Sequence, residues 1–198
     1  MGYPQINDVE IHTENALTFV VAGNLSYLKG VHHILEVWKS NNEVFKNHKL
    51  VLVGSNFLSR EDFMDLPSNV QIIDRLPRYD FHKLLREADI LISNSYSDGF
   101  GMVITEGMAN GLCVIATRNS VAPDIITHNL NGILIDAGDN SMLLQSMKWC
   151  TDNIESVQGI KHKAYELSKK YSWKDYRTRL VESVLLKYIS EKDNISNK

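Results

Sequence analysis

The sequence predicts an α/β fold: a single doubly wound parallel sheet of the Rossmann-like type, with helices on both faces and further helices towards the C-terminus. Short apolar runs rich in β-branched residues alternate with segments whose apolar residues recur at helical spacing. The apolar runs are hydrophobic almost throughout, which is typical of strands buried on both faces. Parallel strands need long crossover connections, and these are right-handed in nearly all cases. The alternation therefore indicates helices on both sides of one sheet.

The expected elements follow in order from Ala16, after a polar stretch without periodicity. Six apolar runs are expected to form strands, at residues 17–22, 49–53, 70–73, 89–93, 112–116 and 132–135. Helical spacing occurs at residues 31–39, 81–88, 141–150, 156–170 and 173–191, and the segment after Gly101 opens a further helix. We therefore expect a leader or linker remnant at residues 1–15, a Rossmann-like domain at 16–172, and a C-terminal helix with a polar tail at 173–198.

Composition argues against several classes of protein. A net charge of -3 gives no electrostatic reason to expect a nucleic-acid partner. Two cysteines, Cys113 and Cys150, are too few for a disulfide framework, and Cys113 lies in an apolar run where it is expected to be buried. No apolar run approaches the roughly 20 residues of a membrane-spanning helix, and the N-terminus lacks a signal-peptide pattern. We expect a cytoplasmic protein.

The histidines do not indicate a metal centre. Of the seven, only His32 and His33 are adjacent, and the sequence has neither an H-E-x-x-H motif nor a cysteine–histidine cluster. We expect His32 and His33 to be a surface pair, and we expect no metal and no separate cofactor.

The expected strand order predicts where a ligand site lies. In a sheet of order 3-2-1-4-5-6, ligands bind beyond the carboxyl ends of the first and fourth strands, where the strand order reverses. The loops there are residues 23–30, GNLSYLKG, and residues 94–101, NSYSDGFG, and both lead into helices. The first loop does not match G-x-G-x-x-G, so a nicotinamide or flavin site is not indicated.

These two loops favour an anionic ligand. A helix reached through Gly99 and Gly101 exposes backbone N–H groups, and its dipole favours an anion there. Lys29 can add a positive charge, and Gly30, which has no Cβ, is expected to let a ligand approach the backbone. Because two loops converge, a diphosphate is the expected anion.

Two acids flank the glycine turn of the second loop, and they also have a purely structural interpretation. Asp98 can be an N-cap of the following helix, and Glu106 can be an exposed helical glutamate. An Asp-Gly-x-Gly turn alone is not specific for a ligand.

Four segments carry a resemblance to a known family: FVVAGNLSYLKGVHHIL, KLVLVGS, NVQIIDRLPRYDFHKLLREADILISNSYSDGFGMVITEGMANGLCVIAT and NGILIDAGD. In this order they resemble the C-terminal, donor-binding domain of the retaining GT-B glycosyltransferases, the group 1 family that contains glycogen synthases, sucrose synthases and bacterial mannosyl- and glucosyltransferases. The similarity extends from about Thr18 to Tyr176. It includes YSW at residues 171–173, which resembles the turn before the family's last helix.

The resemblance gives the two acids roles. The family's signature is Glu, seven residues, Glu across a Gly-Phe-Gly turn; here it is Asp98, seven residues, Glu106. By resemblance, Glu106 accepts hydrogen bonds from the ribose of a nucleoside diphosphate sugar, Asp98 lies against the transferred sugar, and Lys29 clamps the diphosphate. These three are the expected catalytic residues. The donor-binding residues that the resemblance implies are Gly23, Asn24, Lys29, Gly30, Arg75, Leu76, Asp98, Gly99, Phe100, Gly101 and Glu106.

The resemblance also implies partners. The enzymes of this family transfer hexoses with retention, here without a metal, to a glycan or lipid-linked acceptor that an N-terminal Rossmann domain holds. The present sequence is about half that long, so this domain is expected in cis in a full-length protein or in another chain, and any membrane association only through it. Part of the apolar stripe of the last helix is then expected to be uncovered and to support weak self-association or contact with that domain. The stripe contains Tyr176, Leu180, Val184 and Tyr188.

Three positions depart from the family's pattern. Asn24 replaces a frequent arginine, which removes one phosphate-binding charge unless Arg75 or Arg78 supplies it. Asp98 is one methylene shorter than the usual glutamate. Cys113 stands where a proline is usual, which is expected to affect packing only.

Three hypotheses about function stay open. The first is the donor-binding half of a glycosyltransferase. The second is a non-catalytic sugar-nucleotide-binding subunit, for which Asn24 and Asp98 would reflect loss or retuning of activity. The third, an unrelated Rossmann enzyme, is disfavoured by the order of the matching segments.

Overall fold

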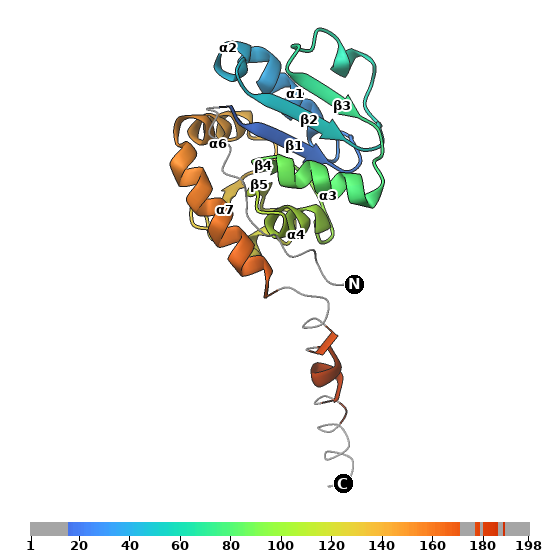
Figure 1. Ribbon diagram of the computed structural model, residues 1–198. Coiled ribbons are helices and arrows are strands. Elements are labelled where there is room, and N and C mark those ends of the chain that lie inside the picture. Colours follow the sequence, from blue (N-terminus) through green and yellow to red (C-terminus); the bar gives the residue numbers. More distant parts are fainter. Residues whose placement is uncertain (1–15, 171–176, 179, 186–187, 189–198) are drawn as a thin grey trace.

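A computed structural model describes residues 16–170, 177–178, 180–185 and 188 of the chain (Figure 1). Its centre is a six-stranded sheet in which every neighbouring pair is parallel, in the order β3-β2-β1-β4-β5-β6. This confirms the predicted fold class and strand order. The strands are β1 Thr18–Ala22, β2 Lys49–Val53, β3 Val70–Ile73, β4 Ile90–Ser93, β5 Cys113–Thr117 and β6 Ile133–Ile135.

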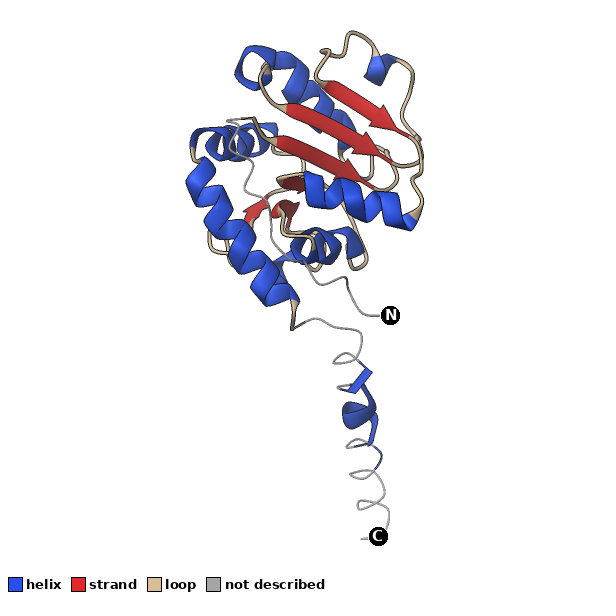
Figure 2. Ribbon diagram, viewed as in Figure 1, coloured by secondary structure: helices blue, strands red, loops and turns tan. Residues whose placement is uncertain are grey.

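Helices lie in the connections between the strands, and the β2–β3 connection contains only a short 3-10 turn (Figure 2). The helices are α1 Val31–Ser40, α2 Asn42–Phe45, the 3-10 turn η1 Glu61–Phe63, α3 Arg78–Glu87, α4 Met102–Ala109, α5 Ala122–Ile125, α6 Asn140–Asp152 and α7 Ile154–Ser168. The short α2, η1 and α5 were not expected. Helix α3 begins three residues earlier than predicted, directly after Pro77, whose extended ψ of 149° sets the chain direction and whose carbonyl accepts from the Phe81 N–H.

Successive strand residues point to opposite faces and build two cores. Phe19 and Val21 of β1 join one core with residues of α1 and α6, whereas Val20 between them joins a second core with residues of α3, α4 and α5. Helix α7 contributes to both cores, through Val157 on one side and Ala164 on the other. Both faces of the sheet are therefore covered, which explains the continuous apolar runs.

Strand β3 departs from the predicted burial. It is an edge strand paired only with β2, and its Gln71 and Ile72 are exposed, Ile72 to 44%. Edge position alone does not cause this exposure, because the other edge strand, β6, is buried along its whole length.

A buried ion pair fastens α7 to the sheet. Lys161 Nζ donates to Asp89 Oδ1 at 2.8 Å, and the two side chains are 10% and 8% exposed. The other carboxylate oxygen of Asp89 accepts from the Thr18 N–H at 3.0 Å. The pair thus joins the last described helix of the domain to the starts of β1 and β4.

The two cysteines lie inside the larger core. Cys113 and Cys150 are free and fully buried, so the expectation that Cys113 acts as a packing residue is confirmed. A side-chain hydrogen bond with the neighbouring Cys113, which favours the protonated form, and burial both raise the pKa of the Cys150 thiol well above its ordinary range. The Cys150 side chain is therefore a neutral thiol at physiological pH.

The described residues beyond 170 are helical, as predicted, and their apolar side chains face solvent. Leu180 is 49% exposed, Val184 59% and Tyr188 56%. Tyr176, the YSW turn at 171–173 and the proposed leader at 1–15 lie outside the described residues. No helix within the described part is long and apolar enough to cross a bilayer.

Candidate functional site

Two loops meet at the carboxyl edge of the sheet, where the strand order reverses. The loop between β1 and α1 and the loop between β4 and α4 are joined by backbone and side-chain contacts. The Tyr96 N–H donates to the Leu28 carbonyl at 2.9 Å, and Asn94 Nδ2 donates to the Gly30 carbonyl at 3.2 Å. The predicted convergence of the two loops is therefore confirmed.

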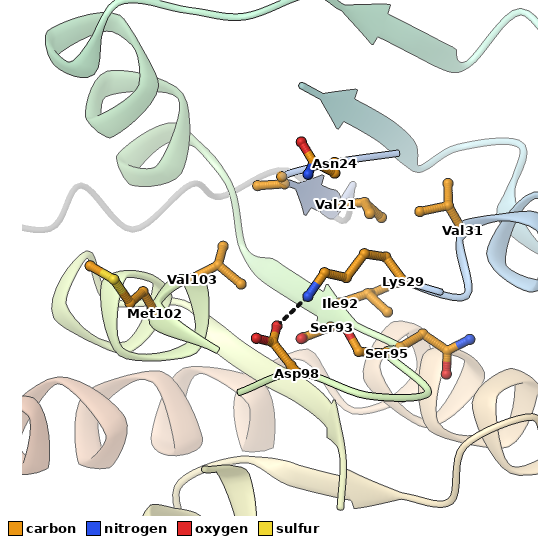
Figure 3. Close-up of a pocket in the computed structure, with 13 residues that line it drawn as sticks. Val21, Asn24, Lys29, Val31, Ile92, Ser93, Ser95, Asp98, Met102 and Val103 are labelled. Atoms are coloured by element: carbon orange, nitrogen blue, oxygen red, sulfur yellow. Dashed lines mark hydrogen bonds and ion pairs between the residues drawn. The ribbon is translucent and has the colours of Figure 1, made fainter. Parts of the chain in front are cut away.

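A pocket of about 150 Å³ lies between these loops (Figure 3). Its lining combines apolar side chains of β1, α1, β4 and α4 with polar side chains of the two loops. Of the described residues that line it, only Lys29 carries a positive charge. The lining residues are Val21, Ala22, Gly23, Asn24, Lys29, Val31, Ile92, Ser93, Asn94, Ser95, Asp98, Met102 and Val103.

Lys29 and Asp98 form an ion pair across the pocket. Lys29 Nζ donates to Asp98 Oδ2 at 2.6 Å, and the side chains are 30% and 19% exposed (Figure 3). Asp98 Oδ1 accepts from the Gly101 N–H at 3.1 Å, directly before α4. The N-cap of α4 is Gly101, without a side-chain cap, so the interpretation of Asp98 as the N-cap is wrong. Asp98 instead holds the turn before the helix and faces the pocket.

Gly30 is required by the protein itself. It adopts φ 61°, and a Cβ built there would lie 2.1 Å from the Asn94 carbonyl oxygen. The expectation that its missing Cβ lets a ligand approach is wrong, because Asn94 fills this space. Gly23 and Gly99 differ, since a Cβ on either would have no neighbour within 4 Å.

Glu106 lies on α4, one turn beyond the pocket lining. It follows Met102 by four residues and Val103 by three, so all three share one face of the helix. Glu106 is half-buried, which corrects the expectation of an exposed helical glutamate. Burial raises the pKa of the Glu106 carboxyl, and the nearby His82 and Arg78 of α3 offset part of that rise.

The remaining predicted site residues do not belong to the pocket lining. Arg75, after β3, donates from Nε to Ser55 Oγ and is exposed. Leu76 packs against the second core. Phe100 is 54% exposed, and Gly101 is buried in a left-handed conformation with φ 76°. Asn24 lines the pocket, whereas Arg75 and Arg78 do not. Neither arginine therefore supplies a second cation to the lining.

Sequence reasoning missed two residues that hold the second loop. The buried Asn94 fastens it to Gly30, and Tyr96 Oη lies 2.6 Å from His33 Nε2. The position of both residues in the nominated loop was the available signal. His32 and His33 are half-buried, with His33 18% exposed and their rings 4.1 Å apart, so the expected surface pair is partly covered. No group of three or more potential metal ligands occurs among the described residues.

Comparison of the sequence with protein families finds a match over residues 4–167 to the family described as glycosyl transferases group 1. A relative is an uncharacterized glycosyltransferase of Methanocaldococcus jannaschii, 29% identical over 175 residues, which are 86% of this chain and 49% of the relative. The chain spans about half or less of the length of the first curated relatives that it matches.

Solved structures share the fold. The C-terminal domain of a glycosyl transferase group 1 family protein from Francisella tularensis superposes with a TM-score of 0.71 at 20% identity, covering 79% of this chain and 87% of that domain. The Anabaena protein HepE in complex with UDP-glucose superposes with a TM-score of 0.74 at 20% identity, covering 86% of this chain and 49% of HepE. At these identities the likeness concerns the fold.

Proposed function

This chain belongs to the family of glycosyl transferases group 1, and from that premise we propose that it is the donor-binding half of a retaining hexosyltransferase. The ligand is a nucleoside diphosphate sugar, bound between the β1–α1 and β4–α4 loops. The observation that carries the proposal is the pocket at the switch point, which is lined by Lys29 and lies between two glycine loops.

The diphosphate fits the positive end of the pocket. Lys29 supplies a full charge, and α4 begins at the same loop with its N-terminus, whose dipole favours an anion. When the anomeric bond breaks, negative charge builds on the leaving diphosphate, and fixed positive groups that stabilise it lower the barrier. No metal is part of this proposal.

Glu106 and Asp98 bind opposite ends of the donor in this proposal. Glu106 accepts hydrogen bonds from the ribose hydroxyls, one helical turn from the pocket-lining Met102. Asp98 faces the sugar and positions it, rather than acting as a covalent nucleophile. Arg75 and Leu76, which follow β3, contribute to the nucleobase side. HepE, a neighbour in fold, was crystallised with UDP-glucose, which supports a ligand of this class.

A second Rossmann domain, in cis or in another chain, would hold the glycan or lipid-linked acceptor. The exposed side chains of Leu180, Val181 and Val184 supply an apolar surface for such a domain. The cytoplasm is the proposed location, because the two cysteines are too few for the disulfide framework of a secreted protein.

Calorimetric titration tests the proposal. The chain is titrated with uridine, guanosine and adenosine diphosphates and with their glucose or mannose conjugates, and saturable binding of at least one pair is expected below millimolar concentration. Absence of binding to every one of them would overturn the proposal. Binding without any transfer or donor hydrolysis, even with an acceptor domain present, would favour the alternative of a non-catalytic sugar-nucleotide-binding subunit. This alternative has a specific observation in its favour, because Asn24 stands where the family frequently has an arginine.

A further inference from the structure

The only pocket-lining cation in the described part of the chain is already paired with a carboxylate. Lys29 Nζ lies 2.6 Å from Asp98 Oδ2, and both side chains line the pocket. They are 30% and 19% exposed, so solvent screens the pair less than a fully exposed one. A diphosphate that binds Lys29 therefore has to draw the ammonium away from Asp98 or share it.

Asp98 is held in place by its other contacts. Its Oδ1 accepts from the Gly101 N–H at 3.1 Å, and its own N–H donates to the Asn119 carbonyl at 3.0 Å. The carboxylate thus stays in the pocket when Lys29 turns to a phosphate. It then has no cation partner and faces another anion, and like charges a few ångströms apart repel.

We propose that Asp98 competes with the bound phosphate for Lys29, so that the pocket prefers a nucleoside diphosphate sugar to the bare nucleoside diphosphate. This inference rests on the proposed function. When a sugar is attached, its hydroxyl groups donate to the Asp98 oxygen that Lys29 leaves. When the sugar has gone, those donors are absent, Asp98 regains Lys29, and the nucleoside diphosphate dissociates. Asp98 is in this way a device for product release.

Asp98→Asn is the informative variant. An asparagine keeps the size of the side chain and an oxygen that accepts from the Gly101 N–H, but it loses the charge that holds Lys29. We expect binding of the bare nucleoside diphosphate to tighten by roughly three- to tenfold, and binding of its sugar conjugate to weaken or stay the same. The ratio of the two dissociation constants, measured by calorimetry, therefore falls.

Asp136→Asn is the matched control. Asp136 also forms an ion pair, with Arg118 at 3.1 Å, and it follows β6 at the same edge of the sheet, outside the pocket lining. The Asp136→Asn variant removes one negative charge, as Asp98→Asn does, and we expect it to leave the ratio of the two dissociation constants unchanged. Equal effects of the two variants would attribute the change to net charge and overturn the inference.

A second pair of variants distinguishes competition of Asp98 for Lys29 from direct repulsion between Asp98 and the phosphate. In a Lys29→Gln background there is no ammonium to mask, so adding Asp98→Asn should change the affinity for the bare diphosphate by less than about twofold. A tightening as large as in the wild-type background would overturn the inference. Failure of the wild-type chain to bind any nucleotide would remove the proposed function as well. Nucleotide binding with an unchanged ratio in Asp98→Asn would remove this inference alone.

Discussion

Lys29 and Asp98, 69 residues apart in the sequence, form an ion pair of 2.6 Å that joins the first and second glycine loops. Lys29 is the one positively charged residue among the described pocket-lining residues, so its position determines where an anion can bind. The predicted phosphate-binding residue Lys29 and the predicted sugar-binding residue Asp98 are therefore in contact, and substitution of either residue tests this contact.

Lys29→Ala should weaken binding of a nucleoside diphosphate much more than binding of the free nucleoside. The proposed contact is to phosphate, and a charge-assisted hydrogen bond contributes about 1.5–3 kcal/mol, so a loss of roughly tenfold or more is expected for the diphosphate. Calorimetry with both ligands measures the difference. Equal losses for the two ligands would assign Lys29 to the fold rather than to the anion site.

Glu106→Gln should stabilise the ligand-free protein and weaken donor binding. Burial raises the pKa of the Glu106 carboxyl, so the folded state binds this proton more tightly than the unfolded state. The stability contribution of the neutral carboxyl is fully present below the unfolded pKa and is lost as pH rises through the raised folded pKa.

At neutral pH the ionised Glu106 thus lowers the free energy of unfolding, and the neutral glutamine does not. We expect Glu106→Gln to raise the melting temperature at pH 7 by about 1–3 °C, with the gain disappearing below the ordinary pKa of a glutamate. Donor affinity should fall roughly tenfold if Glu106 accepts from ribose. A melting temperature that drops at pH 7 would contradict the burial argument, and an unchanged dissociation constant would contradict the ribose contact.

The sequence predicts the central sheet well because its signals are local and redundant. Each of the six strands has an apolar run, and the alternation with helices constrains their order, so the sequence alone places β1 and β4 at the switch point. The exposure of Ile72 was missed because an apolar run does not reveal how completely the helices cover each face of a given strand.

The sequence predicts where the site lies in the fold, but not which of its side chains touch. The loops that contain Lys29 and Asp98 follow from topology, but the pairing of these two side chains depends on a distance that no local pattern encodes. Gly30 illustrates the same limit. The sequence indicates a glycine next to a helix, and only the structure identifies Asn94 as the group that excludes a Cβ.

Gly30→Ala should destabilise the fold, whereas Gly99→Ala should not. An alanine at Gly30 would place its Cβ 2.1 Å from the Asn94 carbonyl oxygen at φ 61°, so the two loops have to separate. We expect a loss of about 2 kcal/mol or more in the free energy of unfolding for Gly30→Ala, and less than about 0.5 kcal/mol for Gly99→Ala. Denaturant melts measure both, and similar losses would show that the contact with Asn94 does not constrain the loops.

Lys161→Met should be strongly destabilising, because it leaves the Asp89 carboxylate buried without its ion-pair partner. Removing one partner of a buried pair typically costs about 3–5 kcal/mol. Lys83→Met is the control: Lys83 lies 3.9 Å from Glu87 on the exposed face of α3, where a change below about 1 kcal/mol is expected. If the two variants had equal stability, the Asp89–Lys161 pair would not anchor α7 to the sheet.

The last prediction concerns transfer itself. The described residues form one Rossmann unit, and the chain spans 49% of its relative from Methanocaldococcus jannaschii. In the proposed function the donor lies against this unit, while closure of a second domain over the pocket excludes water and completes the site. We therefore expect these 198 residues alone to bind the donor, and to hydrolyse it slowly at most, without transferring the sugar to an acceptor.

Addition or fusion of an acceptor-type Rossmann domain from the same genetic neighbourhood should restore transfer. The exposed apolar side chains of Leu180, Val181 and Val184 are the surface on which this domain is expected to pack, so Val181→Glu and Val184→Glu should weaken the association of the two parts while leaving nucleotide binding unchanged. Ultracentrifugation of the chain alone, with and without these substitutions, shows whether the same surface supports self-association instead. Efficient transfer by the isolated chain would overturn the division of the reaction between two domains, because this domain alone would then bind both substrates.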